Sequence, residues 1–295
     1  IERRMVRSGA GQALILHQAS PHTDSMTPAT AAPSLVVFSD LDGTLLDHDS
    51  YDFEPARPLL SRLAQADVPL ILATSKTAAE VAPIRAALGF AHCPAIVENG
   101  AGILEPGAAT GTDAAARMRL REQVAALPGG LGQRFTGFGD WSTAEIAHRT
   151  GLDPAAAARA ATRQFTEPGV FAGDAAELEA FLEHLRAVGI SAQRGGRFLT
   201  LSFGADKAAR LEEIAWRYRS DGVAPHTVAL GDGENDRAMI EAADIGVVVP
   251  NPAHPPLPAL EGEGDGRVTR APAPGPSGWR RALEGVLASM PALGD

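Results

Sequence analysis

The sequence predicts an α/β fold in which a parallel sheet is interrupted by a second, α+β region. Short, wholly apolar runs alternate with helical patterns early and late in the 295-residue chain. Such runs are typical of parallel strands that are buried on both faces. Between about residues 105 and 203 the pattern changes to helices and half-exposed strands. Strand–helix passages of this kind imply a parallel sheet with right-handed crossovers.

The first predicted strand starts at Leu35 and is followed by two carboxylates one residue apart, Asp40 and Asp42. Ligands of open parallel sheets bind just beyond the carboxyl ends of the strands, so this pair is expected at the rim of an active site. Gly43 lets the backbone turn sharply and bring amide groups close to an anion. Taken alone, the pattern is equally compatible with a strand followed by an Asx turn.

Two further strands follow, separated by a helix. Thr77 and Glu80 form a capping box, the pattern that begins a helix, and Gly89 provides its C-terminal stop. The strands on either side are residues 68–73, which precede Thr74-Ser75-Lys76, and residues 95–97, which precede Glu98-Asn99-Gly100.

Residues 105–203 are expected to form a separate α+β domain inserted into the first. Their first part, 105–139, is rich in Gly and Ala and has no clear strand rhythm. Residues 197–203 alternate enough to predict a half-exposed antiparallel strand. Helices are expected to begin after three N-capping residues, Ser142, Asp153 and Asp174.

The parallel pattern then returns. Residues 227–231 predict a buried strand that ends in Asp232-Gly233-Glu234-Asn235-Asp236, and residues 246–249 predict the next strand. The Pro- and Gly-rich stretch 250–278 is expected to be a loop. A last helix is expected to start at Ser277 and to turn Trp279 into the core.

Composition limits the classes of function. The net charge of −10 argues against sequence-wide attraction to nucleic acid or to an anionic membrane. The single cysteine, Cys93, excludes a disulfide within the chain and suits a reducing compartment, so we expect a cytoplasmic protein. No apolar stretch approaches the ~20 residues of a membrane span. Residues 1–33 are expected to be a disordered leader, and the oligomeric state stays open.

Several strand ends therefore carry polar groups at one rim of the predicted sheet. Converging carboxylates would repel one another and raise each other's pKa. A divalent cation removes that conflict, and Mg²⁺ suits it because it takes oxygen ligands and keeps waters that a phosphoryl substrate can replace. The candidate metal ligands are Asp40, Asp42, Asp232 and Asp236, of which Asp236 is expected either to support the metal or to orient Lys207.

The residue types suggest phosphoryl transfer. Asp40, at the tip of the strand, is the candidate nucleophile and would form an aspartyl-phosphate. Asp42 would act as general acid for the leaving alkoxide and then as base for the hydrolytic water. Thr74 and Lys207 would bind the phosphoryl oxygens and stabilise the charge spread over them.

Four segments resemble, in order, the four motifs of the haloacid dehalogenase (HAD) superfamily phosphatases. They are Asp40–Leu45, Leu72–Lys76, Asp206-Lys207 and Gly231–Asp236. The insertion lies between the second and third, as in members with a C2-type cap, a mobile α+β lid. The resemblance implies a Rossmann-like HAD core, residues 34–104 and 204–295, a C2-type cap, residues 105–203, and Mg²⁺ as cofactor.

A closer resemblance, over nearly all of residues 34–288, is to mannosyl-3-phosphoglycerate phosphatases. It rests mainly on Arg163–Pro168, Gly195–Phe198, Val249–Pro252 and Gly275–Trp279. It implies hydrolysis of mannosyl-3-phosphoglycerate to mannosylglycerate, a compatible solute; some relatives take glucosyl-3-phosphoglycerate instead or as well. The sequence departs from the pattern before Asp206-Lys207, where relatives often have glycine, and at Gly233, where they often have serine.

The implied substrate carries a carboxylate and sugar hydroxyls. An arginine fork matches a carboxylate, whereas Glu and Gln suit hydroxyls. The same side chains are also compatible with ordinary surface charges. The histidines lack metal-ligand spacing and receive no role. The candidate substrate contacts are Gly43, Ser75, Lys76, Asn99, Arg163, Gln164, Glu167, Arg197 and Asn235.

Three alternatives remain open at this point. A phosphatase for another sugar phosphate and a hexose phosphomutase of the same superfamily would use the same core motifs. A non-catalytic binding module that kept the fold is disfavoured because the candidate catalytic residues are all present.

Overall fold

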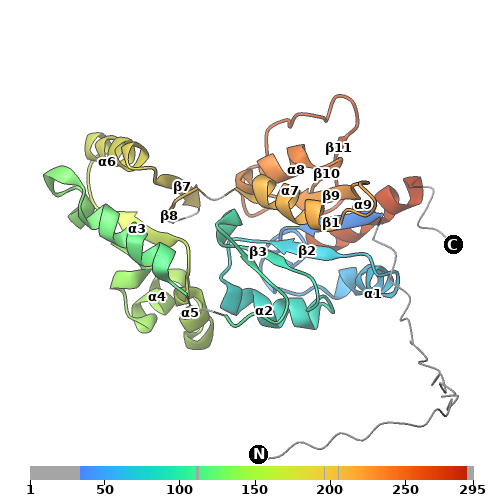
Figure 1. The fold of residues 1–295 in the computed structure, drawn as a ribbon, viewed down its shortest axis with the longest axis horizontal. Coiled ribbons are helices and arrows are strands. Elements are labelled where there is room, and N and C mark those ends of the chain that lie inside the picture. The colour runs from blue at the N-terminus through green and yellow to red at the C-terminus, as the bar shows by residue number, and fades with distance from the viewer. Residues whose placement is uncertain (1–33, 111–112, 196, 205, 291–295) are drawn as a thin grey trace, which may run out of the picture. The chain divides into compact units, whose positions relative to one another are not determined.

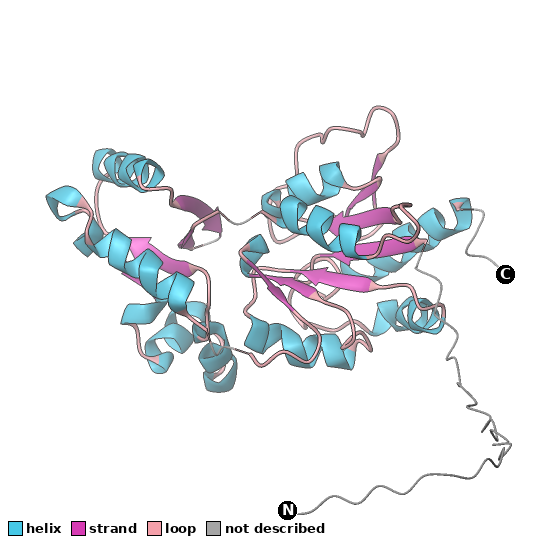
Figure 2. Ribbon diagram, in the orientation of Figure 1, coloured by secondary structure: helices cyan, strands magenta, loops and turns pink. Residues whose placement is uncertain are grey.

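A computed structural model describes residues 34–110, 113–195, 197–204 and 206–290. The predicted leader, residues 1–33, lies outside the described residues. The described strands form one sheet of seven strands and one of four (Figures 1 and 2). None of the helices in these ranges has both the length and the apolar composition needed to cross a membrane.

The seven-stranded sheet has the order β11-β10-β9-β1-β2-β3-β4. Every neighbouring pair is parallel except β3 and β4, which run antiparallel. This confirms the predicted parallel sheet. The strands are β1 (Leu35–Ser39), β2 (Leu70–Ala73), β3 (Ala95–Val97), β4 (Gly102–Leu104), β9 (His226–Gly231), β10 (Ile245–Val248) and β11 (Val268–Arg270).

Helices cover both faces of this sheet. In Figure 1, α1 and α2 lie on one side and α7 and α8 on the other, as expected for a doubly wound sheet. The predicted capping box of α2 is present, with the Thr77 side chain accepting from the amide of Glu80. The helices are α1 (Arg57–Gln65), α2 (Ala78–Ala87), α7 (Lys207–Arg217), α8 (Arg237–Ala242) and α9 (Gly275–Ser289).

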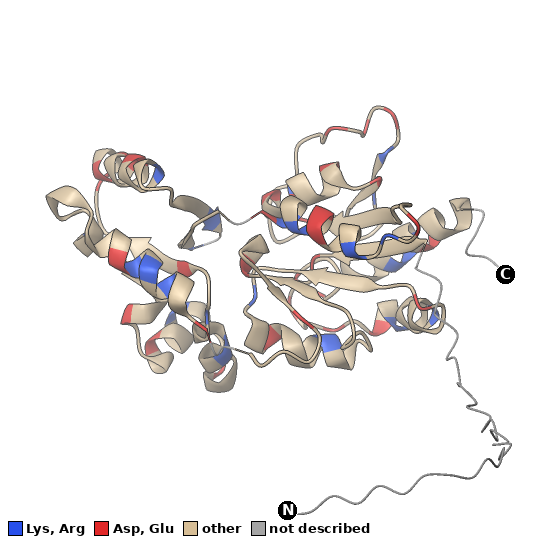
Figure 3. Cartoon of the chain, viewed as in Figure 1, with Lys and Arg blue, Asp and Glu red and all other residues tan. Residues whose placement is uncertain are grey.

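The strands of the large sheet carry no Asp, Glu, Lys or Arg apart from Arg270 in β11, so they appear almost wholly tan in Figure 3. Phe38 and Ile71 are fully buried, and burial of such a side chain stabilises the fold by about 1.5–3 kcal/mol. Trp279 is also fully buried, as predicted, and its indole N–H donates to the Ser39 hydroxyl at 2.9 Å. Charged residues such as Asp40 and Asp232 therefore lie beyond the ends of the strands, not within them.

The four-stranded sheet is antiparallel throughout, with the order β5-β6-β8-β7. The predicted N-caps Ser142, Asp153 and Asp174 each accept a hydrogen bond from the first turn of their helix. The strands are β5 (Phe135–Gly137), β6 (Glu167–Phe171), β7 (Ser191–Gly195) and β8 (Phe198–Ser202), and the helices are α3 (Ala115–Ala125), α4 (Thr143–Thr150), α5 (Pro154–Ala161) and α6 (Ala175–Ala187). The boundaries 105 and 203 of a cap domain stay a prediction.

Two stretches contain elements that the sequence did not predict. Helix α3 lies within 105–139, where only Leu120 and Val124 of the helix are buried, so its apolar periodicity is too weak to read. Strand β11 lies within 250–278, and α9 begins at Gly275 rather than Ser277. A three-residue strand gives no period, and its place is set by pairing with β10.

Candidate functional site

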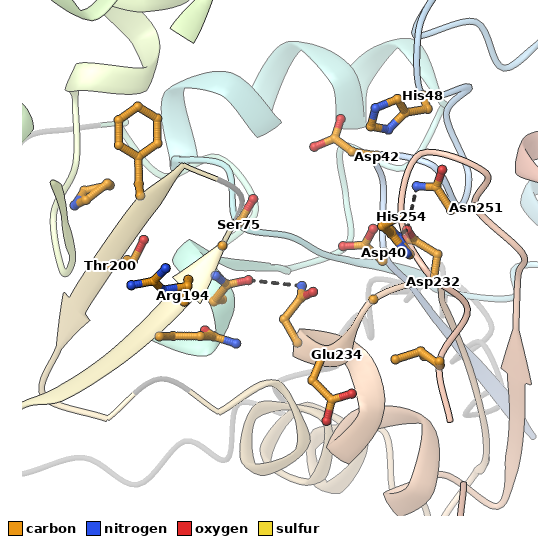
Figure 4. Close-up of a pocket in the computed structure, with 18 of the residues that line it drawn as sticks. Asp40, Asp42, His48, Ser75, Arg194, Thr200, Asp232, Glu234, Asn251 and His254 are labelled. Atoms are coloured by element: carbon orange, nitrogen blue, oxygen red, sulfur yellow. Dashed lines mark hydrogen bonds and ion pairs between the residues drawn. The ribbon is translucent and has the colours of Figure 1, made fainter. Parts of the chain in front are cut away.

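The register of the large sheet places the ends of β1, β2 and β9, which carry three of the predicted motifs, at the same edge of the sheet. Ser39 of β1 lies opposite Leu72 of β2 and Leu230 of β9. The residues that follow these strands, Asp40, Thr74 and Asp232, therefore leave the sheet at the same edge. Asp40 and Asp232 line a pocket of about 850 Å³ at this edge (Figure 4).

Lys207, the first residue of α7, lies at the centre of the site. Its Nζ donates to Asp40 Oδ1 at 2.8 Å, to Asp236 Oδ1 at 2.6 Å and to the Ala73 carbonyl at 2.8 Å. The side chain is 1% exposed, so all its donors face the protein. Two roles were considered for Asp236, supporting the metal and orienting Lys207, and its contact with Lys207 is compatible with the second.

Charge and burial oppose each other here. Burial raises the pKa of Asp40 well above its ordinary value, and the Asp236 and Asp232 carboxylates add to this, while Lys207 counteracts it. Burial alone would lower the pKa of Lys207, but Asp236 and Asp40 more than offset this and raise it. The lysine therefore stays charged and partly compensates a strongly anionic site.

The carboxylate of Asp232 is fixed by three side chains to which the sequence analysis gave no role. The Thr44 hydroxyl donates to Oδ1 at 2.7 Å, Asn251 Nδ2 donates to Oδ2 at 2.8 Å, and His254 Nε2 lies 2.8 Å from Oδ2. Asn251 follows β10, so the strand-end rule could have found it. His254 has no such signal, because only the path of the chain after β10 brings it to Asp232.

Asp42 is held apart from this group. Lys76 Nζ lies 2.9 Å from its Oδ2, whereas its buried Oδ1 has no hydrogen-bond partner among the described residues. Thr74 Oγ1 accepts from the Lys76 amide at 3.2 Å, so the turn after β2 joins these two residues. The chain contains only two lysines, Lys76 and Lys207, and each pairs with one of the two motif carboxylates.

The donor set fits a hard divalent cation. One oxygen each of Asp40, Asp232 and Asp236 lies within 4.8 Å of the others, and all three residues are buried. Only oxygen atoms are offered, which is the preference of Mg²⁺, and the unpartnered Asp42 Oδ1 adds a further acceptor close by.

Four of the predicted substrate contacts line the pocket: Ser75, Asn99, Arg163 and Asn235. Asn235 Nδ2 donates to Asn99 Oδ1 at 3.4 Å, which links the segments that follow β9 and β3. Across the pocket, Figure 4 shows Arg194 and Thr200 on strands of the smaller sheet, and neither was predicted.

Gly43 is required by the backbone conformation of the turn after Asp42. Its φ is +82°, a conformation that favours glycine, and a Cβ there would lie 2.1 Å from Asn251 Nδ2. The glycine therefore lets the turn after Asp42 pack against the residues that hold Asp232.

The other predicted contacts do not line this pocket. Glu167 is 2% exposed and is occupied by Arg117 and by the Gly139 amide. Arg197 donates to the Thr150 carbonyl, and Gln164 Nε2 donates to the Asp113 carbonyl. Since these polar side chains are used within the chain, the structure gives no geometric support for a substrate contact by them.

Comparison with known proteins gives a clear result at the level of the family. A family model described as haloacid dehalogenase-like hydrolase matches residues 37–122 and 164–257, more than half of the chain.

Solved structures agree in fold. A Thermotoga maritima protein aligns with a TM-score of 0.58 and 17% identity over 84% of this chain and 96% of its own. The sucrose-phosphatase of Synechocystis sp., solved with sucrose and phosphate, aligns with a TM-score of 0.56 and 15% identity over 86% of this chain and 98% of its own. A HAD-superfamily phosphatase from Bacteroides thetaiotaomicron aligns with a TM-score of 0.51 and 21% identity over 89% of this chain and 98% of its own. At such identities, these matches show the fold alone.

Proposed function

This chain belongs to the haloacid dehalogenase-like hydrolases, and we propose that it is a Mg²⁺-dependent phosphatase that acts through an aspartyl-phosphate. The observation that carries the proposal is the placement of two differently paired carboxylates. Asp40 is paired with the buried Lys207, while Asp42 is paired with the more accessible Lys76. The Lys207 ammonium, with a cation when bound, would hold Asp40 as the carboxylate that a nucleophile must be, while Asp42 lines the pocket where a leaving group would depart.

In the first step an Asp40 carboxylate oxygen attacks phosphorus, and the bond between phosphorus and the leaving oxygen breaks. Asp42 gives its proton to the departing alkoxide. Lys207 and Thr74 stabilise the charge on the phosphoryl oxygens, and Lys207 also holds Asp40 in place. The products of this step are the alcohol and phosphorylated Asp40.

In the second step Asp42, now a carboxylate, takes a proton from water as the water oxygen attacks phosphorus. The bond between phosphorus and Asp40 then breaks, which releases inorganic phosphate and restores both acids. Asp42 can serve both steps because it lines the pocket, where its charge partner Lys76 holds it in place.

Asp40 and Asp232 would hold the cation, with the backbone carbonyl of Asp42 as a further ligand. When bound, Mg²⁺ offsets the negative charge that phosphate brings to this acidic site. Asp236 would act from behind by orienting Lys207. Thr44, Asn251 and His254 would orient Asp232.

We propose a glycosyl-3-phosphoglycerate as substrate, with mannosyl-3-phosphoglycerate first and glucosyl-3-phosphoglycerate second. The support is the sequence resemblance and a pocket whose walls include Arg163, Arg194 and Thr200, groups that suit a carboxylate and hydroxyls. The product would be a compatible solute made in the cytoplasm. Residues 105–203 would form the cap.

The test is phosphate release from a panel of mannosyl- and glucosyl-3-phosphoglycerate, simple hexose phosphates and 3-phosphoglycerate. We expect the highest kcat/KM for a glycosyl-3-phosphoglycerate. Equal rates across the panel would remove the substrate proposal and leave a general sugar-phosphate phosphatase. Dependence on a sugar bisphosphate activator, without net phosphate release, would instead indicate a phosphomutase.

Mg²⁺ is expected to raise the Tm of the protein, because a ligand that binds only the native state stabilises it by about 2.7 kcal/mol at a hundredfold excess over Kd. The Asp232→Asn variant should lose most of this shift. The exposed Asp221, at φ +50°, offers a control, since Asp221→Asn should keep the shift. Differential scanning calorimetry with and without Mg²⁺ makes the measurement, and an equal shift in Asp232→Asn would contradict the assigned ligand.

A further inference from the structure

Glu98 is a buried carboxylate that the proposed chemistry does not use. It follows β3, at the point where the chain leaves the parallel part of the large sheet, and its side chain is wholly buried. Its φ of +51° and that of Asn99, +60°, lie in the left-handed region, which non-glycine residues rarely adopt. Strained positions of this kind persist where the surrounding contacts hold them in place.

The contacts of Glu98 come from one short segment between α5 and β6. Its Oε1 accepts from the Gln164 amide at 2.8 Å. Its Oε2 accepts from the amides of Phe165 at 3.2 Å and Thr166 at 2.8 Å, and from the Thr166 hydroxyl at 2.6 Å. Successive amides that converge on one anion form a strong anchor, because a buried carboxylate requires such donors.

This anchor is connected to the pocket from two directions. Arg163 precedes the anchored amides, lines the pocket and donates to the Ser75 carbonyl at 3.3 Å; its Nη1 lies 3.7 Å from Glu98 Oε2. Asn99, the neighbour of Glu98, also lines the pocket and accepts from Asn235. Displacement of Glu98 would therefore shift both groups.

The backbone around Glu98 is also closely packed. A Cβ at Gly100 would lie 2.4 Å from the Asp206 carbonyl carbon, and a Cβ at Gly102 would lie 2.1 Å from the Phe165 ring. The chain that follows Glu98 therefore packs closely against the backbone at Asp206 and against the Phe165 ring. A shift of the anchored segment has little room to be absorbed locally.

We propose that Glu98 is a positioning residue, which fixes segment 163–166 so that Arg163 and Asn99 form two walls of the substrate pocket. This inference rests on the proposed phosphatase function for its kinetic consequence. It assigns Glu98 to the recognition of the organic part of the substrate, not to phosphoryl transfer. Among the described residues, Glu98 makes no hydrogen bond or ion pair with Asp40, Asp42 or Lys207.

The test is the Glu98→Gln variant, which keeps the shape but turns an N–H₂ group toward converging donors. We expect kcat/KM for the best sugar phosphate of the panel to fall by about 10- to 100-fold, since misplacing a binding group costs this much. Hydrolysis of p-nitrophenyl phosphate, whose small organic part does not need these walls, should change less than about twofold. Hydrogen exchange at the amides of residues 164–166 should accelerate, at a temperature where circular dichroism shows the variant folded.

Two further variants keep the test decisive. Thr166→Val removes only the hydroxyl donor and should change both readouts in the same direction by less. Glu145→Gln neutralises a carboxylate that caps α4, away from the pocket, and should change neither. Equal loss for both substrates, or unchanged exchange at 164–166 in Glu98→Gln, would overturn the proposal. If the wild type hydrolyses no phosphate ester, the proposed function fails, while the exchange measurement still decides whether Glu98 anchors the segment.

Discussion

The Asp40→Asn variant is expected to lower kcat by about 10⁴-fold or more, because the amide cannot act as the attacking oxygen nucleophile. The fold should survive, since asparagine has the same shape as aspartate. In the wild type Lys207 Nζ donates to Asp40 Oδ1 at 2.8 Å, and the amide oxygen of asparagine can accept the same hydrogen bond. In the wild type, burial and then the Asp236 and Asp232 carboxylates raise the pKa of Asp40. The neutral asparagine removes this electrostatic repulsion between position 40 and the two remaining carboxylates. Steady-state phosphate release and circular dichroism together make the measurement.

Asp49 provides a matched control, since it is an exposed aspartate nine residues further along the same segment. Asp49→Asn should retain wild-type kcat. If Asp40→Asn retained wild-type turnover, the nucleophile would have to be another group, and the two-step mechanism would be wrong.

The Lys207→Met variant is expected to lose both activity and stability. Removal of the buried ammonium leaves Asp40 and Asp236 without their shared counter-charge and the Ala73 carbonyl without its donor. Breaking a buried ion pair on one side costs about 3–5 kcal/mol in the free energy of unfolding. Denaturant unfolding in the absence of divalent cations measures this loss.

A second variant tests the cause. Lys207→Met combined with Asp236→Asn should recover part of the lost stability, because it removes one of the two uncompensated charges. It should not recover activity, since the Lys207 ammonium that would stabilise the phosphoryl oxygens is still absent. A double variant no more stable than Lys207→Met alone would show that packing, rather than charge, accounts for the loss.

The large sheet was predictable because its strands are apolar on both faces and its helices carry local start signals. Thr77 with Glu80, Ser142, Asp153 and Asp174 all cap the helices they predict. Strands β4 and β11 were missed because each is a three-residue run that includes Gly or polar residues, unlike the wholly apolar β3. Their positions depend on pairing with β3 and β10.

The residues of the candidate site also fall into a predictable group and a group that the sequence could not place. The placement of Asp40, Thr74, Lys207 and Asp232 could be predicted because each stands next to a strand or at a helix start, where geometry follows from local sequence. His254 was missed because it reaches Asp232 only through an irregular segment. Long polar side chains such as Glu167 and Arg197 were harder still, because the sequence does not show whether a charge faces a pocket or, as here, Arg117 or the Thr150 carbonyl.

The most direct test of the account is to quench the working enzyme in acid and map phosphorylation by mass spectrometry. Acid is used because an acyl phosphate survives it better than base. With the Mg²⁺-loaded protein and its best substrate, the peptide that contains Asp40 should carry one phosphoryl group, on Asp40, during turnover only. The Asp40→Asn protein should carry none. Rapid turnover with unmodified Asp40 throughout a time course that resolves the first turnover, or a phosphoryl group on another residue, would contradict the proposed mechanism.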